Sequence, residues 1–224
     1  ENMETLTINS VGGANTITTL TSTDLTSLTV NASAALTITN AIASATSLAT
    51  VDASGSTAAV DIDATNSGAT IAMTITGGSG NDTLEGGAGN DTISGGAGDD
   101  QLIGNGGANT YNGGAGADNI DGDSGAETIN GGAGNDDIDG AAGNDTIDAG
   151  AGDDTITFDV DGDLNANDTV DGGDGTDTVA LTISTDLSTA FTLSNVENVD
   201  LTANNGLTTV DFANSSSVMN VEIQ

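Results

Sequence analysis

Short alternations of apolar and polar residues run through the first third of the chain and predict β-strands. In residues 1–76 they form triplets such as LTI at 6–8 and VDI at 60–62, and no helical stripe competes with them. Threonine, which is abundant here, favours strands through its branched β-carbon. The stretch at 25–38 is echoed at 48–62, which favours stacked coils. We therefore predict a β-solenoid, with a sandwich of short strands as the alternative.

A second pattern places one apolar residue at every ninth position from 77 to 157. Nine nonapeptides, GGSGNDTLE to AGAGDDTIT, follow one another, and a tenth, GGDGTDTVA, stands at 172–180 after an insertion at 158–171. The eighth place of each unit holds an apolar residue between polar ones, which predicts a three-residue strand with one inward side chain. Glycines at the first, second and fourth places permit positive φ angles, so six residues can turn tightly. Alternating turns and strands predict a roll.

The sixth place of the nonapeptides carries an oxygen-bearing side chain. It is aspartate in most units, but the fourth unit has Asn109 and the sixth has Glu127. Stacked rows of carboxylates and turn carbonyls would repel each other without a cation. Calcium, with six to eight oxygen ligands at about 2.3–2.6 Å, fits such a cage better than magnesium. We therefore predict several Ca²⁺ ions as the cofactor. The predicted metal ligands are Asp82, Asp91, Asp100, Asn109, Asp118, Glu127, Asp136, Asp145, Asp154 and Asp177.

The nonapeptides resemble those of the RTX, or haemolysin-type calcium-binding, family. This resemblance implies a parallel β-roll in which two nonapeptides make one coil and each ion lies between turns n and n+2. Asp82 would then share an ion with Asp100, and the nine turns would hold about seven ions. The site of Asn109 and Glu127 departs from the pattern, because an amide has no charge and a longer acid places its oxygens differently.

The charge of the chain changes how folding must work. There are 34 Asp and Glu residues and no Lys, Arg or His, so the net charge is −34 and no internal ion pair can form. Self-repulsion would keep the glycine-rich half expanded without cations, so we expect folding and metal binding to be one event. The same charge excludes nucleic acid as a partner and opposes contact with anionic lipid heads.

Composition narrows the architecture further. Only 2% of the residues are aromatic, which excludes a thick globular core and favours a thin solenoid. Cysteine is absent, so disulfides and thiolate metal sites play no part. There is no apolar run long enough for a membrane span, and direct membrane insertion is not expected.

Three domains are predicted from these patterns. They are a Thr/Ala/Ser-rich β-solenoid at 1–76, a calcium-binding RTX roll at 77–180, and capping strands with the start of a further solenoid segment at 181–224. The fold class is all-β, a parallel β-roll flanked by solenoid segments. ENVDLT at 197–202 echoes ENMETLT at 1–7, which predicts that the chain is a piece of a longer repeating protein.

The insertion at 158–171 contains a short acidic motif. Asp159, Asp161 and Asp163 resemble the start of an EF-hand loop, but Val170 stands where that loop requires glutamate. We predict a loop, with one accessory calcium site as the alternative.

The combination of this solenoid with RTX repeats resembles the calcium-dependent S-layer proteins of Gram-negative bacteria and the large RTX adhesins. The resemblance implies type I secretion, folding in extracellular calcium and a place on the bacterial cell surface. The predicted function is structural: an S-layer, sheath or filament subunit that binds copies of itself through calcium-dependent contacts, with cell-surface polysaccharide as a further partner.

Two other functions compete with this one. The chain could be a rigid spacer repeat of a giant RTX adhesin, or the calcium-binding tail of a secreted enzyme. Without His, Cys, Lys or Arg, neither a Ser-His-Asp triad nor a zinc HExxH site is possible within these residues. We therefore predict that the chain is not an enzyme, and we assign no catalytic residue.

Overall fold

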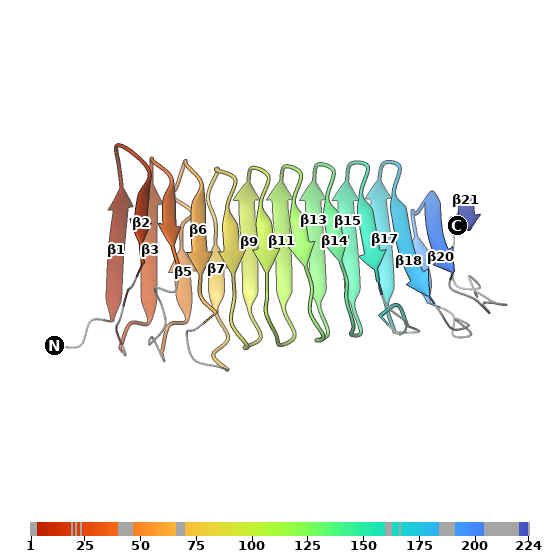
Figure 1. The fold of residues 1–224 in the computed structure, drawn as a ribbon, viewed down its shortest axis with the longest axis horizontal. Helices are drawn as coiled ribbons and strands as arrows, with labels where there is room; N and C mark the ends of the chain where they lie inside the picture. The colour runs from red at the N-terminus through yellow and green to blue at the C-terminus, as the bar shows by residue number, and fades with distance from the viewer. Residues whose placement is uncertain are drawn as a thin grey trace.

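The computed structural model describes residues 4–18, 20, 22, 24–39, 47–65, 70–159, 163–165, 167–183, 191–203 and 220–223 of the chain. Their strands form two long parallel sheets that face each other across one thin core (Figure 1). Within these ranges there is no helix, and so none that could span a membrane.

Successive strands alternate between the two sheets, so that each coil gives one strand to each sheet. The first sheet has ten strands: β1 (Thr5–Ser10), β3 (Ser27–Ala32), β5 (Thr50–Asp52), β7 (Thr74–Thr76), β9 (Thr92–Ala97), β11 (Thr110–Ala115), β13 (Thr128–Ala133), β15 (Thr146–Ala151), β17 (Thr169–Asp174) and β19 (Thr192–Ser194). The second sheet has eleven: β2 (Asn15–Ile17), β4 (Leu36–Ile38), β6 (Val60–Asp63), β8 (Thr83–Glu85), β10 (Gln101–Ile103), β12 (Asn119–Asp121), β14 (Asp137–Asp139), β16 (Thr155–Phe158), β18 (Thr178–Ile183), β20 (Asn198–Ala203) and β21 (Asn220–Ile223). The chain is therefore a β-solenoid, as predicted, and not a sandwich.

The strand register shows two nonapeptides in each coil. Thr92 pairs with Thr110, and Thr110 with Thr128, so these coils repeat every 18 residues, as the resemblance implied. The sheets continue through the 76/77 boundary, because β7 pairs with β9 and β6 pairs with β8. The N-terminal solenoid and the roll are thus one continuous stack.

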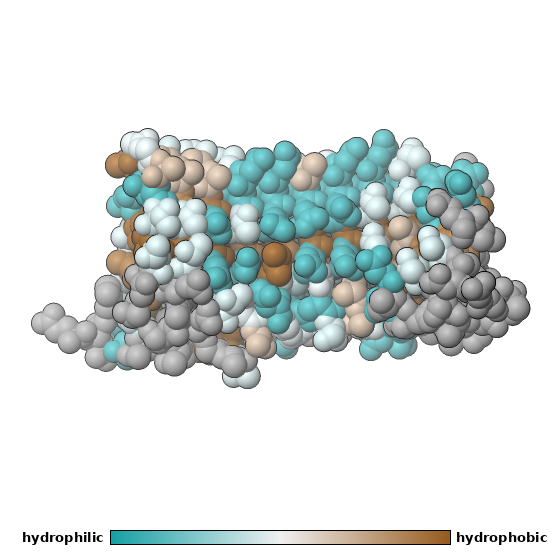
Figure 2. Space-filling model, in the orientation of Figure 1, coloured by the Kyte–Doolittle hydropathy of each residue, from teal (hydrophilic) through white to brown (hydrophobic). Residues whose placement is uncertain are grey.

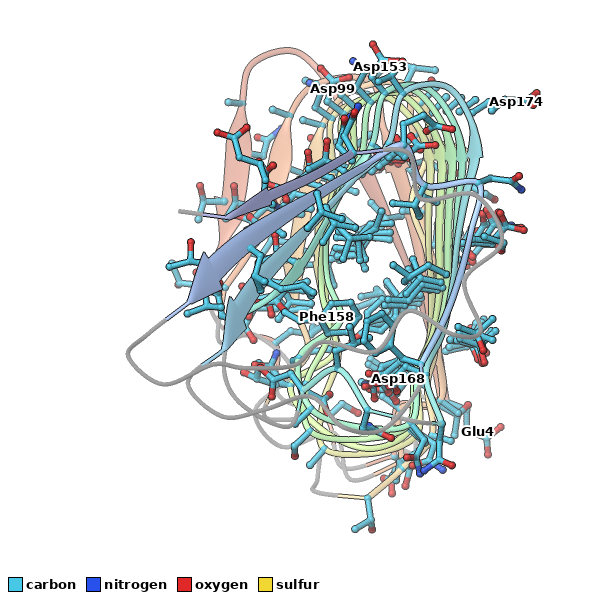
Figure 3. All side chains as sticks on the ribbon, turned by 90° about the vertical axis from the view of Figure 1, so that its right-hand side faces the viewer. Glu4, Asp99, Asp153, Phe158, Asp168 and Asp174 are labelled. Carbon is cyan, nitrogen blue, oxygen red and sulfur yellow. The ribbon has the colours of Figure 1, made fainter. Side chains whose placement is uncertain are left out.

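The core consists of rows of stacked aliphatic side chains. The apolar residue in the eighth place of the nine consecutive nonapeptides is at most 2% exposed and lies against its counterparts in the coils before and after. Seen along the stack, these side chains superimpose as bundles between the sheets (Figure 3). The members of the two rows are Leu84, Ile93, Leu102, Tyr111, Ile120, Ile129, Ile138, Ile147 and Ile156.

Strand length differs between the sheets, which corrects the expectation of uniform three-residue strands. β10, β12 and β14 do have three residues, but β9, β11, β13 and β15 have six. The longer strands run into the next nonapeptide, where Gly114 pairs with Gly96 and Gly132. Those glycines still adopt positive φ, 113° at Gly114. The same residues therefore pair in the sheet and form part of the turn.

The two long edges of the stack are unlike. The regular edge, at the top of Figure 1, carries the connections from first-sheet to second-sheet strands, which are as short as residues 98–100. The variable edge, at the bottom, carries the return connections, which are as long as residues 159–168. Insertions in this chain therefore fall on one side of the molecule.

The C-terminal segment adds further strands to both sheets. β18 pairs with β20, and β20 pairs with β21, so the described part of 181–224 prolongs the stack. Residues 204–219 lie outside the described residues. The echoing sequences are not equivalent in the coil, because β1 belongs to the first sheet and β20 to the second.

Core packing gives a first prediction. Ile138 is fully buried between Ile120 and Ile156, so Ile138→Ala should lower the free energy of unfolding by about 2–5 kcal/mol through lost burial and a cavity. The measurement is urea unfolding in saturating calcium. The matched control is Asp137→Ala at the exposed neighbouring position, which should change stability little. Equal losses in both variants would contradict the packing argument.

Candidate metal sites along the two edges

The sixth-place side chains are buried and lie in two rows. All are at most 2% exposed, and alternate nonapeptides send them to opposite edges. The regular-edge row is Asp82, Asp100, Asp118, Asp136, Asp154 and Asp177. The variable-edge row is Asp91, Asn109, Glu127, Asp145 and Asp168. Every predicted ligand is therefore in one of these rows, beside the sixth-place residues of turns n−2 and n+2.

A hydrogen bond joins neighbouring members of the regular-edge row, and of the variable-edge row except between Asn109 and Glu127. The backbone N–H of Asp82 donates to Oδ1 of Asp100 at 2.7 Å, and the N–H of Asp100 donates to Oδ1 of Asp118 at 2.8 Å. The same bond recurs on the variable edge, where the N–H of Glu127 donates to Oδ1 of Asp145 at 2.9 Å. These bonds fix the carboxylates in direction, because one oxygen is committed to the previous coil.

The second oxygen of most of these carboxylates has no donor from the chain. The orphaned buried atoms are Oδ2 of Asp100, Asp118, Asp136, Asp145, Asp154 and Asp177, and both carboxylate oxygens of Glu127. A buried anion without a partner is strongly unfavourable, and this chain has no basic side chain to supply one. Burial, together with neighbouring carboxylates, raises the pKa of Asp100 to about 7 and that of Asp136 to about 6.

A backbone carbonyl lies close to each orphaned oxygen of the regular edge. A methyl group placed on Gly131 would be 2.5 Å from Oδ2 of Asp136 and closer still to the carbonyl oxygen of Ala149. Gly131 is thus required for space and not for a positive φ, which it does not have, whereas the ninth nonapeptide has Ala149 in this place. Carboxylate and carbonyl oxygens around a small open space are the ligands that calcium prefers, so these residues fit that ion.

Backbone atoms must supply much of any coordination sphere. Within the described ranges, no three acidic side chains converge on one point. In many turns one carboxylate and a carbonyl of the next coil instead line a small space, here called a cradle, as Asp100 and the carbonyl of Gly113 do. The first-place glycines beside such cradles are Gly77, Gly86, Gly95, Gly113, Gly131 and Gly172. A row built this way holds cations only when the coils are stacked, which couples binding to folding.

The carboxylate in the first acidic turn on each edge accepts a backbone hydrogen bond at its second oxygen, so it is partly satisfied without a cation. Oδ2 of Asp82 accepts the N–H of Gly78 at 2.7 Å, and Oδ2 of Asp91 accepts the N–H of Gly87 at 2.8 Å. Farther along the regular edge the second glycine has positive φ, and the orphaned oxygen of Asp118 has no such donor. The need for a cation is therefore greatest in the interior of the roll.

Neutral hydroxyls replace the carboxylates in the N-terminal coils. The buried Ser56 hydroxyl donates to the carbonyl of Val30 at 3.1 Å and accepts the N–H of Ala32 at 3.0 Å. Ser10 donates to the carbonyl of Ala34 at 2.9 Å on the same edge. The buried polar groups of these turns find hydrogen-bond partners within the chain. The N-terminal coils therefore do not require a metal ion at these turns.

The two exceptional turns of the variable edge differ from each other. The Asn109 side chain is fully hydrogen-bonded within the chain, whereas neither carboxylate oxygen of Glu127 has a donor. Burial and the adjacent Asp145 carboxylate raise the pKa of Glu127. Glu127 and Asp145 must therefore share either a cation or a proton.

The structure places two further acidic residues in the rows, Asp168 and Glu197. The N–H of Asp145 donates to Oδ1 of Asp168 at 2.8 Å, and the N–H of Asp177 donates to Oε2 of Glu197 at 2.9 Å. Each continues one of the rows. The signal for Asp168 was visible in NDTV at 167–170, which repeats the NDTL and NDTI of other units.

The insertion is consequently shorter than predicted. Val170 is buried in the core and belongs to β17, which pairs with β15. The accessory calcium alternative depends on Asp161, which lies outside the described residues.

A comparison with known protein families identifies the repeats that carry these two rows of side chains. The family described as RTX calcium-binding nonapeptide repeat (4 copies) matches residues 74–102, 103–138, 121–156, 131–164 and 163–181. Residues 74–181 are RTX repeats. The repeats of this family bind calcium, which agrees with the oxygen-lined cradles of this RTX roll. No curated protein and no solved structure matches the chain.

Single carboxylates of the RTX roll can be tested against matched neighbours. Asp136→Asn keeps an Oδ1 that accepts the N–H of Asp118 but removes the charge, so calcium bound per chain should fall by at least one ion. Asp137→Asn changes an exposed residue and should leave the number unchanged. Calorimetric titration with calcium measures both. The same stoichiometry in the two variants would exclude Asp136 as a ligand.

The raised pKa values predict an unusual pH dependence. A buried carboxyl whose folded pKa exceeds its unfolded value stabilises the fold below about pH 4, and this stabilisation is lost as pH rises through the folded pKa, about 7 for Asp100. Calcium-free protein should therefore show more strand signal by circular dichroism at pH 4 than at pH 8. In saturating calcium the order should reverse, because ligands must be deprotonated. A calcium-free signal that rises with pH would contradict this account.

Proposed function

We propose that this chain is a structural element of a bacterial cell surface, an S-layer, sheath or filament subunit that folds and assembles when it binds extracellular calcium. The observation that carries the proposal is the row of buried, partnerless carboxylate oxygens along one continuous stack. Such a stack is stiff when its cradles are filled and expanded when they are empty. Type I secretion of an unfolded chain into calcium is consistent with this behaviour.

The first described coil leaves apolar surface at one end of the stack, where a further coil of this chain or of a second copy would pack. β1 is the terminal strand of the first sheet, and beside it Leu6, Ile8 and Ile17 are only partly buried while Val11 is 68% exposed. Apolar residues gather at this end of the molecule in the surface view (Figure 2). A strand edge next to apolar surface is a surface on which another parallel coil can stack.

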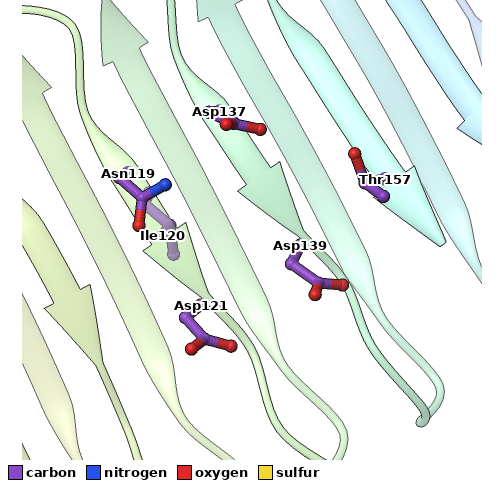
Figure 4. Close-up of a pocket in the computed structure, with 6 residues that line it drawn as sticks. All are labelled: Asn119, Ile120, Asp121, Asp137, Asp139 and Thr157. Atoms are coloured by element: carbon purple, nitrogen blue, oxygen red, sulfur yellow. The ribbon is translucent and has the colours of Figure 1, made fainter. Parts of the chain in front are cut away.

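The outer face of the second sheet supports calcium-dependent lateral contact. Asp121 of β12 lies opposite Asp139 of β14, in a shallow groove that Asn119, Asp137 and Thr157 also line (Figure 4). Partial burial and nearby acids raise the pKa of Asp121 and of Asp139. Facing copies would repel each other here, and divalent cations would reduce that repulsion.

A rigid spacer of a giant RTX adhesin is the second candidate. It is favoured by the continuity of the sheets through β20 and β21, since a spacer needs only length and stiffness. A calcium-binding tail of a secreted enzyme is less well supported, because nothing in the stack is aimed at a substrate. Cell-surface polysaccharide remains a proposed further partner of the structural role.

Electron microscopy in about millimolar calcium, the range of extracellular modules, separates these functions. The structural role predicts sheets or filaments that disperse in EGTA, while circular dichroism shows strand formation with calcium. D121N/D139N should still fold with calcium, and it should assemble at a lower calcium concentration than the unaltered protein, because it removes outer-face charge that would keep facing copies apart. Folded, dispersed monomers at high protein concentration would favour the spacer, and a spectrum unaffected by EGTA would rule out calcium-driven folding.

A further inference from the structure

The cradle of the fourth nonapeptide is filled by the chain itself. At Gly104, the first glycine of that unit, an added methyl group would lie well under 3.0 Å from Nδ2 of Asn109 and from the hydroxyl oxygen of Tyr111. At the equivalent Gly113 and Gly131 it would meet a carboxylate oxygen and a carbonyl oxygen instead. We infer that this turn is built to remain without a metal ion, as a hydrogen-bonded plug formed by Asn109 and Tyr111.

The direction of the Asn109 amide is fixed by its partners. Oδ1 accepts the N–H of Asp91 at 2.7 Å, which is the bond that the aspartates make in other turns. Nδ2 must therefore point into the cradle, where it donates to Oδ2 of Asp123 at 2.9 Å. It also lies 3.3 Å from the carbonyl of Gly106 and 3.4 Å from the Tyr111 hydroxyl. An N–H group directed into the cradle repels a cation.

Tyr111 completes the plug. It is the only tyrosine of the chain, and it stands where the other consecutive nonapeptides have leucine or isoleucine. Its ring is in the core, and its hydroxyl reaches past the aliphatic row to the carbonyl of Asp121 at 3.2 Å.

Asp123 compensates the loss of charge at position 109. It occupies the second place of its nonapeptide, where the first five units have glycine or, in the fourth, asparagine. Its Oδ2 takes the amide hydrogen, and its Oδ1 accepts the N–H of Gly125 at 2.9 Å. The negative charge thus lies beside an amide donor and not beside a cation.

The plug divides the variable-edge row. Asp91 lies on one side of it, and Glu127, Asp145 and Asp168 lie on the other, so the row has no continuous line of ions. The regular-edge row has no such interruption. This turn is held by internal hydrogen bonds, so its structure does not depend on calcium, unlike that of the other turns of the roll. The inference rests on the proposal that the other cradles take calcium.

The test is to open the plug. N109D/Y111I gives the fourth turn the Asp and Ile of the second turn, so calcium bound per chain should rise by at least one ion in calorimetric titration. The converse variant D118N/I120Y places the same pair on the regular edge and should lose at least one ion. Circular dichroism in calcium confirms that each variant is folded before ions are counted.

A measurement on the unaltered protein makes the test independent of the variants. In the calcium-loaded chain, the side-chain amide hydrogens of Asn109, assigned by the NMR signal missing in N109D, should exchange slowly with solvent. Fast exchange, or an unchanged ion count in N109D/Y111I while the wild type binds calcium, would overturn the plug. A wild type that binds no calcium would overturn the proposed function, a result distinguishable from failure of the plug alone.

Discussion

Neutralising buried carboxylates in a chain without a single basic residue is the constraint on which this structure depends. The backbone bonds of the roll place an aspartate inside each regular-edge turn from Asp82 to Asp177, and one oxygen of these aspartates is committed to the coil before it. The remaining oxygens cannot be satisfied by side chains that the sequence does not contain. Cations from solution are the available partners, so folding depends on the cations in the surrounding solution.

Alternation of strands between two sheets explains why the irregular units share one side. Of the nine consecutive nonapeptides, the even-numbered ones all turn on the variable edge, and Asn109, Glu127 and the insertion before Asp168 belong to that edge. On both edges glycines lie close to carbonyls of the adjacent coil, Gly114 to that of Gly96 and Gly125 to that of Gly107, so the edges differ in the length of their connections. One edge is thus suited to a continuous row of ions, and the other accommodates longer connections.

The same two sheets combine turns with different requirements. Ser10 and Ser56 satisfy the N-terminal turns with neutral hydrogen bonds, and the N–H of Val60 meets Oδ1 of Asp82 at 2.8 Å where the acidic row begins. A stack in which each coil contacts only its neighbours can order one section before another. The N-terminal coils, whose turns need no cation, therefore adjoin the coils whose turns need one. The first group can serve as a template on which the second group folds.

The sequence by itself determined the strands, the inward residue of each nonapeptide and the oxygen-bearing side chain in the sixth place of each turn, because these follow from local periods of two and nine residues. Only the tertiary structure decided which turns share an edge, that Gly96 and Gly114 pair to lengthen first-sheet strands, and that Glu197 extends a row. It also decided that the Tyr111 hydroxyl reaches the cradle beside Asn109. These features arise from contacts between successive coils, and the spacing within a single nonapeptide does not encode where a side chain of the next coil will lie.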